Sequence, residues 1–408
     1  MSPPAPLPVL KGTVNVNSSI LTAPRVRPAG RAATAAPAVP WHVYAVLFAT
    51  TSVVVGVLWD ISWHSSIGRD TFWSPPHLAI YLGGVVAGVA CGWHVLHTTF
   101  AGTPEERATA VGWWWRFRGA LGAWACIWGT FAMLASAPFD DWWHNAYGLD
   151  VKILSPPHTV LALGILAIQL GAMFMVLALQ NRSGEHRAFR WMFACAAGLV
   201  LINFAIMATE YTFRIRQHGV LFYQVSALLF PVVLAAAAVA GRLRWPATAT
   251  AAVYMGTLLF LIWIFPLFPA EPRLAPVRFP LRQMTPPQFP LLLIIPAVAF
   301  DLVLHRWGGR PRGWLLAMVL GAAFLLPFFA AQWPFADWLM SPAARTPFTG
   351  QHLRPYFVGE DAYSVRGVFY NPSSGTELVK GLAIALGIGV LSARLGIGWG
   401  NWMARVRR

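Results

Sequence analysis

Two stretches of this chain repeat the same order of aspartate and histidine residues, and both residue types bind metal ions. The ligand-type residues are Asp60, His64 and His77 in the first copy, and Asp140, His144 and His158 in the second. The spacings agree apart from one extra residue before the last histidine of the second copy. One carboxylate and two imidazoles form the donor set of non-haem Fe(II) sites, and the same donors bind Zn(II) and Cu(II). The repeat therefore predicts at least one metal site.

The spacing within each copy predicts a helical hairpin. In the first copy, Asp60 and His64 are four residues apart, so on a helix they share one face. Gly68 then permits a turn, and Ser74 with the proline after it is typical of a helix N-cap and first helical position. His77 follows in the first turn of the next helix. Three ligands are thus expected to converge where the two helices meet.

A simpler interpretation is that these residues are solvated or pair with arginines such as Arg69, Arg214 or Arg216. The repetition of both halves of the pattern favours metal binding instead, but it leaves open whether the copies share one centre or form two. Further acidic and imidazole groups predicted at the same level, as additional ligands or as groups that orient a ligand, are Asp70, Asp141, Asp150, Glu210 and His218. The tryptophans in and beside the copies fit an interfacial belt, with a substrate cage as the alternative.

The elements that must position these residues are membrane helices. Hydrophobic residues make up 57% of the 408 residues, charged residues only 11%, and the mean hydropathy is +0.55. Apolar runs of about 18 or more residues predict transmembrane helices. The predicted spans are 41–59, 78–98, 119–139, 158–179, 190–210, 219–240, 247–267, 288–305, 313–333 and 377–397. The fold class is therefore an all-α, polytopic transmembrane helical bundle of about ten spans in a lipid bilayer, with duplicated two-helix hairpins.

The net charge of +15 lies mainly in short loops, where the positive-inside bias predicts cytoplasmic arginines. A nucleic-acid-binding protein would need those charges gathered on one soluble face, so this class is excluded. The expected location is a bacterial inner (plasma) membrane, with both termini cytoplasmic and the metal sites at the periplasmic, outer face. The predicted segments are a disordered tail (1–40), a transmembrane domain (41–397) with motif hairpins at 59–78 and 139–159, and a basic tail (398–408). A weaker third hairpin is expected at 210–219.

Two further features have no definite role from the sequence alone. The outer loop 334–376 is long enough to be a lid, a binding loop or a partner surface. His94 and His97 lie three residues apart near the inner end of the second span, without a third ligand nearby in sequence. An interfacial role is therefore favoured for these two histidines.

The pattern Asp60-x3-His64-x12-His77 resembles the metal-binding motif of the C subunit of particulate methane and ammonia monooxygenases. The resemblance covers a short part of the chain, and the second copy departs from it by one residue. It implies a copper-dependent membrane protein in which an aspartate and two histidines hold a metal. The residues to which it carries over are Asp60, His64 and His77.

Three functions follow as expectations. The first is a metal-dependent, monooxygenase-like membrane oxidoreductase, or a subunit of one, that acts on a small apolar substrate. Copper is the favoured metal for it, with iron or zinc as alternatives. The second is a metal-handling or transport protein, which would need polar groups along the spans, where the sequence has few. The third is a non-catalytic subunit that assembles with other membrane subunits.

Overall fold

The computed structural model describes residues 38–68, 71–113, 116–148, 155–182, 186–271, 282–307, 313–353 and 371–408. The chain divides into two units, Met1–Pro37 and Ala38–Arg408, and everything below concerns the second. Most of the predicted tail 1–40 lies outside the described residues, so its predicted disorder stays a prediction.

Long apolar helices dominate the described residues, which confirms the all-α class. Nine of them are long and apolar enough to cross a membrane. They are α1 (Trp41–Ser66), α2 (Pro75–Phe100), α4 (Leu121–Tyr147), α5 (Pro156–Arg182), α6 (Arg187–Met207), α8 (Val220–Ala240), α9 (Pro246–Ile264), α11 (Trp314–Leu339) and α13 (Gly375–Met403). Between α2 and α4 lie the short helix α3 (Pro104–Thr109) and an antiparallel ribbon of β1 (Val111–Trp113) and β2 (Phe117–Gly119), in which Val111 pairs with Gly119.

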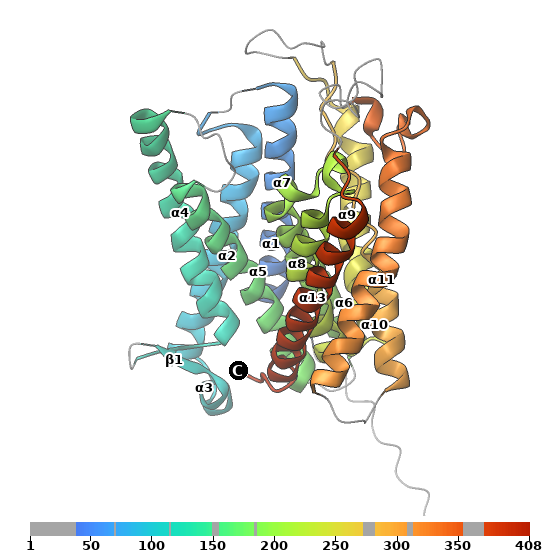
Figure 1. The fold of residues 1–408 in the computed structure, drawn as a ribbon. Helices are drawn as coiled ribbons and strands as arrows, with labels where there is room; N and C mark the ends of the chain where they lie inside the picture. Colours follow the sequence, from blue (N-terminus) through green and yellow to red (C-terminus); the bar gives the residue numbers. More distant parts are fainter. Residues whose placement is uncertain are drawn as a thin grey trace, which may run out of the picture. The chain divides into compact units, whose positions relative to one another are not determined.

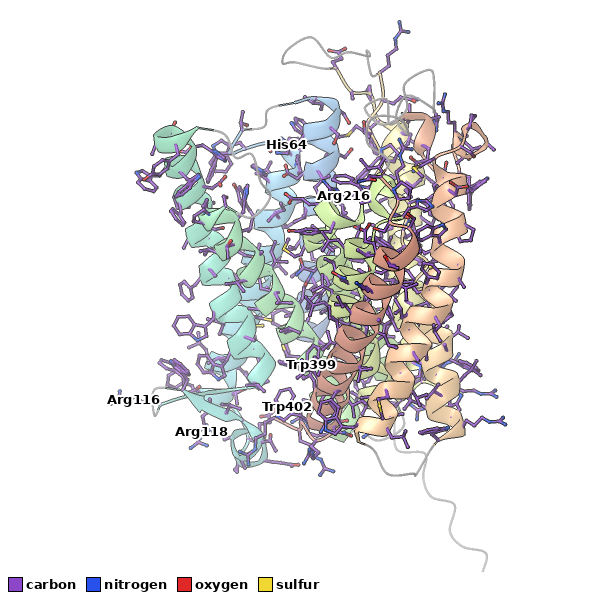
Figure 2. All side chains as sticks on the ribbon, viewed as in Figure 1. His64, Arg116, Arg118, Arg216, Trp399 and Trp402 are labelled. Carbon is purple, nitrogen blue, oxygen red and sulfur yellow. The ribbon has the colours of Figure 1, made fainter. Side chains whose placement is uncertain are left out.

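The helices pack as neighbouring hairpins. Helix α1 packs on α2, α4 packs on α5, and α2 and α4 join the two hairpins. Helix α13 packs against α8 and α11 on the other part of the bundle. Figure 1 shows α2 and α4 at one side and α10 (Ile294–Arg306) and α11 at the other, with the C-terminus at the same end as α3. His64 lies at the opposite end (Figure 2). The ligand-type residues and the C-terminus are therefore separated by the length of the helices.

Glycines allow the backbones of α4 and α5 to approach closely. A Cβ atom added at Gly129 would lie 2.6 Å from the carbonyl oxygen of Gly164, and one added at Gly164 would lie 2.8 Å from that of Gly129. Gly122 and Gly171 face one another in the same way, one heptad away. Small residues at such positions let membrane helices pack through their backbones. This close packing sets the separation of the residues at the ends of α4 and α5.

The predicted eighth span, 288–305, was wrong in its first part. The structure has a 13-residue helix, α10 (Ile294–Arg306), about 20 Å long, which alone is shorter than the hydrocarbon core of about 30 Å. The chain before α10 is extended and largely buried, with Met284 only 4% and Leu293 0% exposed. Three prolines, Pro286, Pro287 and Pro290, prevent a continuous helix there because they lack a backbone N–H.

Polar side chains replace the helical hydrogen bonds of this extended stretch. The N–H of Thr285 donates to Ser66 Oγ at 2.7 Å, and that of Leu291 donates to Tyr254 Oη at 3.0 Å. The N–H of Leu292 donates to Gln332 Oε1 at 2.9 Å. Non-helical backbone is tolerated at membrane depth where neighbouring helices satisfy it in this way. Residues 282–306 together therefore make one crossing, as an extended half followed by a helical half.

Several predicted boundaries moved. Helices α1 and α4 continue to Ser66 and Tyr147, past their predicted ends at residues 59 and 139. Helix α11 continues to Leu339, so the first residues of the predicted loop 334–376 are helical. The short 3-10 turns η3 (Pro342–Ala344) and η4 (Gln351–Leu353) follow, and residues 354–370 lie outside the described residues. Helix α13 continues to Met403, past its predicted end at residue 397.

Candidate metal centre

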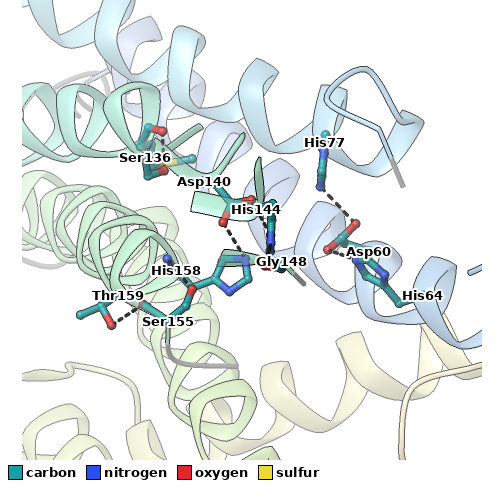
Figure 3. Close-up of polar contacts among 11 residues, drawn as sticks. Asp60, His64, His77, Ser136, Asp140, His144, Gly148, Ser155, His158 and Thr159 are labelled. Carbon is teal, nitrogen blue, oxygen red and sulfur yellow. Dashed lines mark hydrogen bonds and ion pairs between the residues drawn. The ribbon is translucent and has the colours of Figure 1, made fainter. Parts of the chain in front are cut away.

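The second copy of the motif brings its three ligand-type residues together. The last turns of α4 carry Asp140 and His144, and the first turn of α5 carries His158. His144 Nε2 lies 3.4 Å from Asp140 Oδ2, and His158 Nε2 lies 3.5 Å from Asp140 Oδ1 (Figure 3). One ligand atom from each residue lies within 4.8 Å of the other two, and all three residues are half-buried. Among the described residues this is the one such group of three.

A backbone carbonyl orients the ring of His144. Its Nδ1 lies 3.1 Å from the carbonyl oxygen of Gly148 and donates to it, since a carbonyl can only accept. The lone pair of a neutral ring is then on Nε2, the nitrogen that faces Asp140. Metal-binding histidines commonly donate their second ring N–H to a carbonyl or carboxylate, which fixes the tautomer and the ring orientation. Gly148 has φ +86° and ψ −173°, a backbone conformation that favours glycine.

The start of α5 positions His158. Ser155 precedes Pro156 as expected for a helix N-cap, and its Oγ accepts from the backbone N–H of His158 at 3.4 Å. Its carbonyl accepts from the N–H of Thr159 at 2.8 Å. The Ser-Pro-Pro-His sequence thus fixes the third ligand-type residue in the first turn, beside the end of α4.

The surroundings of Asp140 fit a bound cation. Its Oδ1 atom is buried and accepts no hydrogen bond. For metal–ligand bonds of about 2.0–2.2 Å, two ligands of a tetrahedral ion lie about 3.4 Å apart. The observed separations of 3.4 and 3.5 Å are close to that value and too long for good hydrogen bonds. The chemistry and the spacing of the donors therefore both suit a transition-metal ion.

The first copy has similar aspartate–histidine distances but a more exposed histidine. His64 Nε2 lies 3.6 Å from Asp60 Oδ2, and His77 Nε2 lies 3.4 Å from Asp60 Oδ1. The His64 side chain is 51% exposed, and the three residues do not form a group like the second copy. Figure 3 shows the two sets apart, each aspartate flanked by its own two histidines. The geometry therefore favours two sets over one shared centre.

A glycine follows the last histidine of each motif helix at the same spacing. From the sequence, Gly68 was predicted only to permit a turn. Gly68 follows His64 by four residues and has φ +109°, just as Gly148 follows His144. The role of the Gly148 carbonyl as an acceptor for His144 was missed, although the shared His-x3-Gly spacing is a signal for it.

Within the described part of the chain, the other predicted site residues do not belong to the group of Asp140, His144 and His158. Asp141 is exposed and accepts from the side chain of Asn145 at 3.3 Å. His218, which is 1% exposed, packs edge-on against Trp333, with ring centroids 4.7 Å apart. Glu210 is half-buried in the short helix α7 (Thr209–Thr212) of the third hairpin. Asp70 and Asp150 lie outside the described residues.

The predicted belt tryptophans include strongly exposed ones. Trp73 is 70% and Trp142 54% exposed, as expected for side chains that anchor helix ends at a membrane interface. On α4, Trp142 also stacks on Phe139, with ring centroids 6.0 Å apart. This exposure fits the belt better than a closed substrate cage.

Comparison of the chain with protein-family models, curated proteins and solved structures finds no match. The site must therefore be interpreted from its own geometry. On that basis the chain is a multi-pass helical protein of membrane type, with an Asp/His/His group able to hold a metal ion.

Proposed function

We propose that this chain is a membrane metalloprotein in which Asp140, His144 and His158 hold a copper ion. We propose further that it is a monooxygenase-like oxidoreductase or a subunit of one. The observation that carries the proposal is the convergence of one buried carboxylate oxygen and two imidazoles, with the His144 tautomer set by Gly148. The first copy, Asp60, His64 and His77, resembles the motif of the copper-dependent particulate monooxygenases, which supports copper over iron or zinc.

Three protein ligands suit a catalytic rather than a purely structural ion. Structural metal sites are usually closed by four protein ligands, whereas catalytic sites keep a position open. When bound, the ion would supply a redox-active Lewis acid at this position. The chain itself supplies the orientation: Gly148 fixes the His144 ring, and Ser155 fixes the turn that carries His158.

The packing below the site favours this function over metal transport. Met133 on α4 and Gly164 on α5 lie one to two turns from the ligand-type residues. They pack closely, because a Cβ atom added at Gly164 would lie 2.9 Å from Met133 Cγ. The next buried residues along α5, Ile165 and Ile168, are apolar. Buried polar side chains of this hairpin include Thr130, Ser136 and Gln169, and each of these donates to a backbone carbonyl oxygen. Transport through this hairpin would need polar groups at the apolar positions as well.

The proposed orientation places both motif sets at the periplasmic face of a bacterial inner membrane. The support is the arrangement of charge: Arg116 and Arg118 lie at the end of the bundle opposite to His64 (Figure 2). Arginines in short loops favour the cytoplasmic side.

Metal analysis of the purified protein tests the centre. Wild type loaded with Cu(II), desalted and measured by mass spectrometry of the metal should retain copper stoichiometrically. His144→Ala and His158→Ala should lose most of the copper of the second set, and His64→Ala should lose less. His352→Ala is the matched control, because His352 is an exposed histidine in η4. The proposal is wrong if wild type retains no copper, iron or zinc, or if His144→Ala retains as much as His352→Ala.

Activity needs a separate measurement. Membranes containing the protein, supplied with a two-electron reductant, should consume dioxygen in the presence of a small apolar substrate. One oxygen atom enters the substrate and the other leaves as water, and the rate should depend on copper and on His144. If metal binds but dioxygen consumption is unaffected by His144→Ala, even with co-purified subunits present, the site has a structural or assembly role instead.

A further inference from the structure

A second polar site lies at the end of the bundle opposite to the metal centre. A cavity of about 540 Å³ opens between the ends of α1, α2 and α5, next to α3 and the C-terminal residues. This size falls in the usual range of ligand pockets, about 300–1,000 Å³. Its titratable residues are His42, His94, His97, Glu106, Arg182 and Arg408.

The histidines of the cavity are arranged as hydrogen-bonding groups. The rings of His42 and His94 lie against one another, with centroids 4.4 Å apart. His94 Nε2 accepts from the backbone N–H of Ala120 at 3.3 Å, so the ring proton is on Nδ1, which is a donor. Among the described residues, these histidines do not belong to a group of three potential metal ligands like the one at Asp140. The cavity therefore offers donors to a ligand rather than a ready metal site.

The charged side chains that line the cavity are two arginines and one glutamate. Arg182 and Arg408 are cationic, whereas Glu106 is the single carboxylate side chain in the lining. The backbone N–H of Thr103 donates to Glu106 Oε2 at 2.7 Å and lowers the pKa of this carboxyl, which is ionised at neutral pH. The two guanidinium groups are therefore the cationic donors available to an anionic ligand.

The position of Arg408 is set by the packing of the last residues on α5. Asn181, which is 8% exposed, donates to the carbonyl oxygens of Met403 at 2.9 Å and Val406 at 2.7 Å. Val406 itself is buried. The side chain of Arg408 therefore lines a defined cavity, across from α1 and α2.

Much of the remaining wall of the cavity is apolar, with Thr98 and Thr109 as further polar residues. Met175 and Leu179 of α5 line it, together with Trp41 and Trp93. Trp41 is 55% and Trp93 54% exposed, and exposed tryptophans of membrane helices lie at the level of the lipid headgroups. A ligand here would have its charged part among the arginines and histidines and an apolar part along the helices.

We propose that this cavity binds the headgroup of an anionic phospholipid that carries a single phosphodiester charge. The guanidinium groups of Arg182 and Arg408 bind the phosphate oxygens, as arginine commonly does. The histidines hydrogen-bond to the remaining headgroup oxygens, and the acyl chains leave past Trp41 and Trp93. Basic pockets between transmembrane helices are suited to anionic lipid headgroups.

Native mass spectrometry of the intact, detergent-solubilised protein tests the proposal. The probes are phosphatidylglycerol, phosphatidylcholine with the same acyl chains, and inorganic phosphate. Phosphatidylglycerol should bind at least about tenfold more tightly than phosphatidylcholine, since only the former has a net negative charge. Arg182→Gln and Arg408→Gln should each weaken phosphatidylglycerol binding about tenfold, as expected when a charged hydrogen bond is lost.

Arg116→Gln is the matched control, because Arg116 is an exposed arginine at the same end of the bundle and does not line the cavity. It should bind phosphatidylglycerol like wild type. If Arg182→Gln does not fold, Arg408→Gln alone decides, since Arg408 lies beyond the last helix. Equal affinity for the two lipids, equal loss in Arg116→Gln and Arg408→Gln, or displacement of the lipid by equimolar inorganic phosphate would each overturn the proposal.

Discussion

Replacing Gly148 with alanine should weaken metal binding without touching any ligand atom. At φ +86° and ψ −173° an alanine is strained by about 1–3 kcal/mol, while its added Cβ would meet no atom within 4 Å. The backbone can relieve this strain by rotating, which moves the carbonyl that accepts from His144 Nδ1. The His144 ring then loses its fixed tautomer and orientation. Loss of such an interaction usually costs 10- to 100-fold in metal affinity, or about 1.4–2.8 kcal/mol.

The assay is a competition titration of Cu(II) against a chelator, with purified wild type, Gly148→Ala and Gly92→Ala. Gly92 is the matched control, because a Cβ there also meets no atom within 4 Å and its backbone is in helix α2. The dissociation constant should rise 10- to 100-fold in Gly148→Ala and stay at the wild-type value in Gly92→Ala. A Gly148→Ala protein that binds copper within threefold of Gly92→Ala would refute the orienting role of the carbonyl.

Three further substitutions test the helix packing below the metal centre, the extended segment before α10 and the start of α3. Gly164→Leu should push α5 from α4 and abolish copper retention by the second set while the protein stays membrane-inserted. Metal analysis and protease protection measure these two outcomes. Gln332→Leu leaves the side chain of Gln217 and the N–H of Leu292 without this partner, and should lower the unfolding free energy by about 1–3 kcal/mol in a denaturant titration. The hydrogen bond from Thr103 lowers the pKa of Glu106, so the ionised carboxylate stabilises the start of α3 at neutral pH. This stabilisation is lost as acid protonates the carboxylate. Hydrogen exchange in α3 should therefore differ between wild type and Glu106→Gln at neutral pH and converge in acid.

The arrangement of the metal centre followed largely from local rules. Asp140 and His144 share a face because of their spacing, and the N-cap at Ser155 places His158 in the first turn, so the sequence was sufficient to predict the hairpin. Which of the two copies brings its three ligand atoms closer together could not be predicted from the sequence. That difference does not follow from glycine packing, since Gly56 of α1 and Gly83 of α2 allow an equally close approach in the first hairpin.

Contacts between distant segments were also beyond the sequence. His94 was recognised only with His97, whereas its ring partner His42 lies on another helix. Residues 288–305 were predicted as a helix because hydropathy counts apolar residues and takes no account of missing N–H donors, whereas the helix begins only at Ile294. The prolines before it were visible, but the acceptors that compensate for the broken helix, such as Ser66 and Gln332, come from other helices.

The extended half of that crossing constrains how the chain is made. A transmembrane helix satisfies its own backbone and can enter the bilayer as soon as it is synthesised, but residues 285–293 depend on other segments for their hydrogen bonds. Ser66 and Tyr254 are synthesised earlier, whereas Gln332 is synthesised about 40 residues later than Leu292. The hydrogen bond from the Leu292 N–H can therefore form only after α11 has been synthesised. Biogenesis of this protein is cooperative at that point, and α11 completes a crossing that precedes it in the chain.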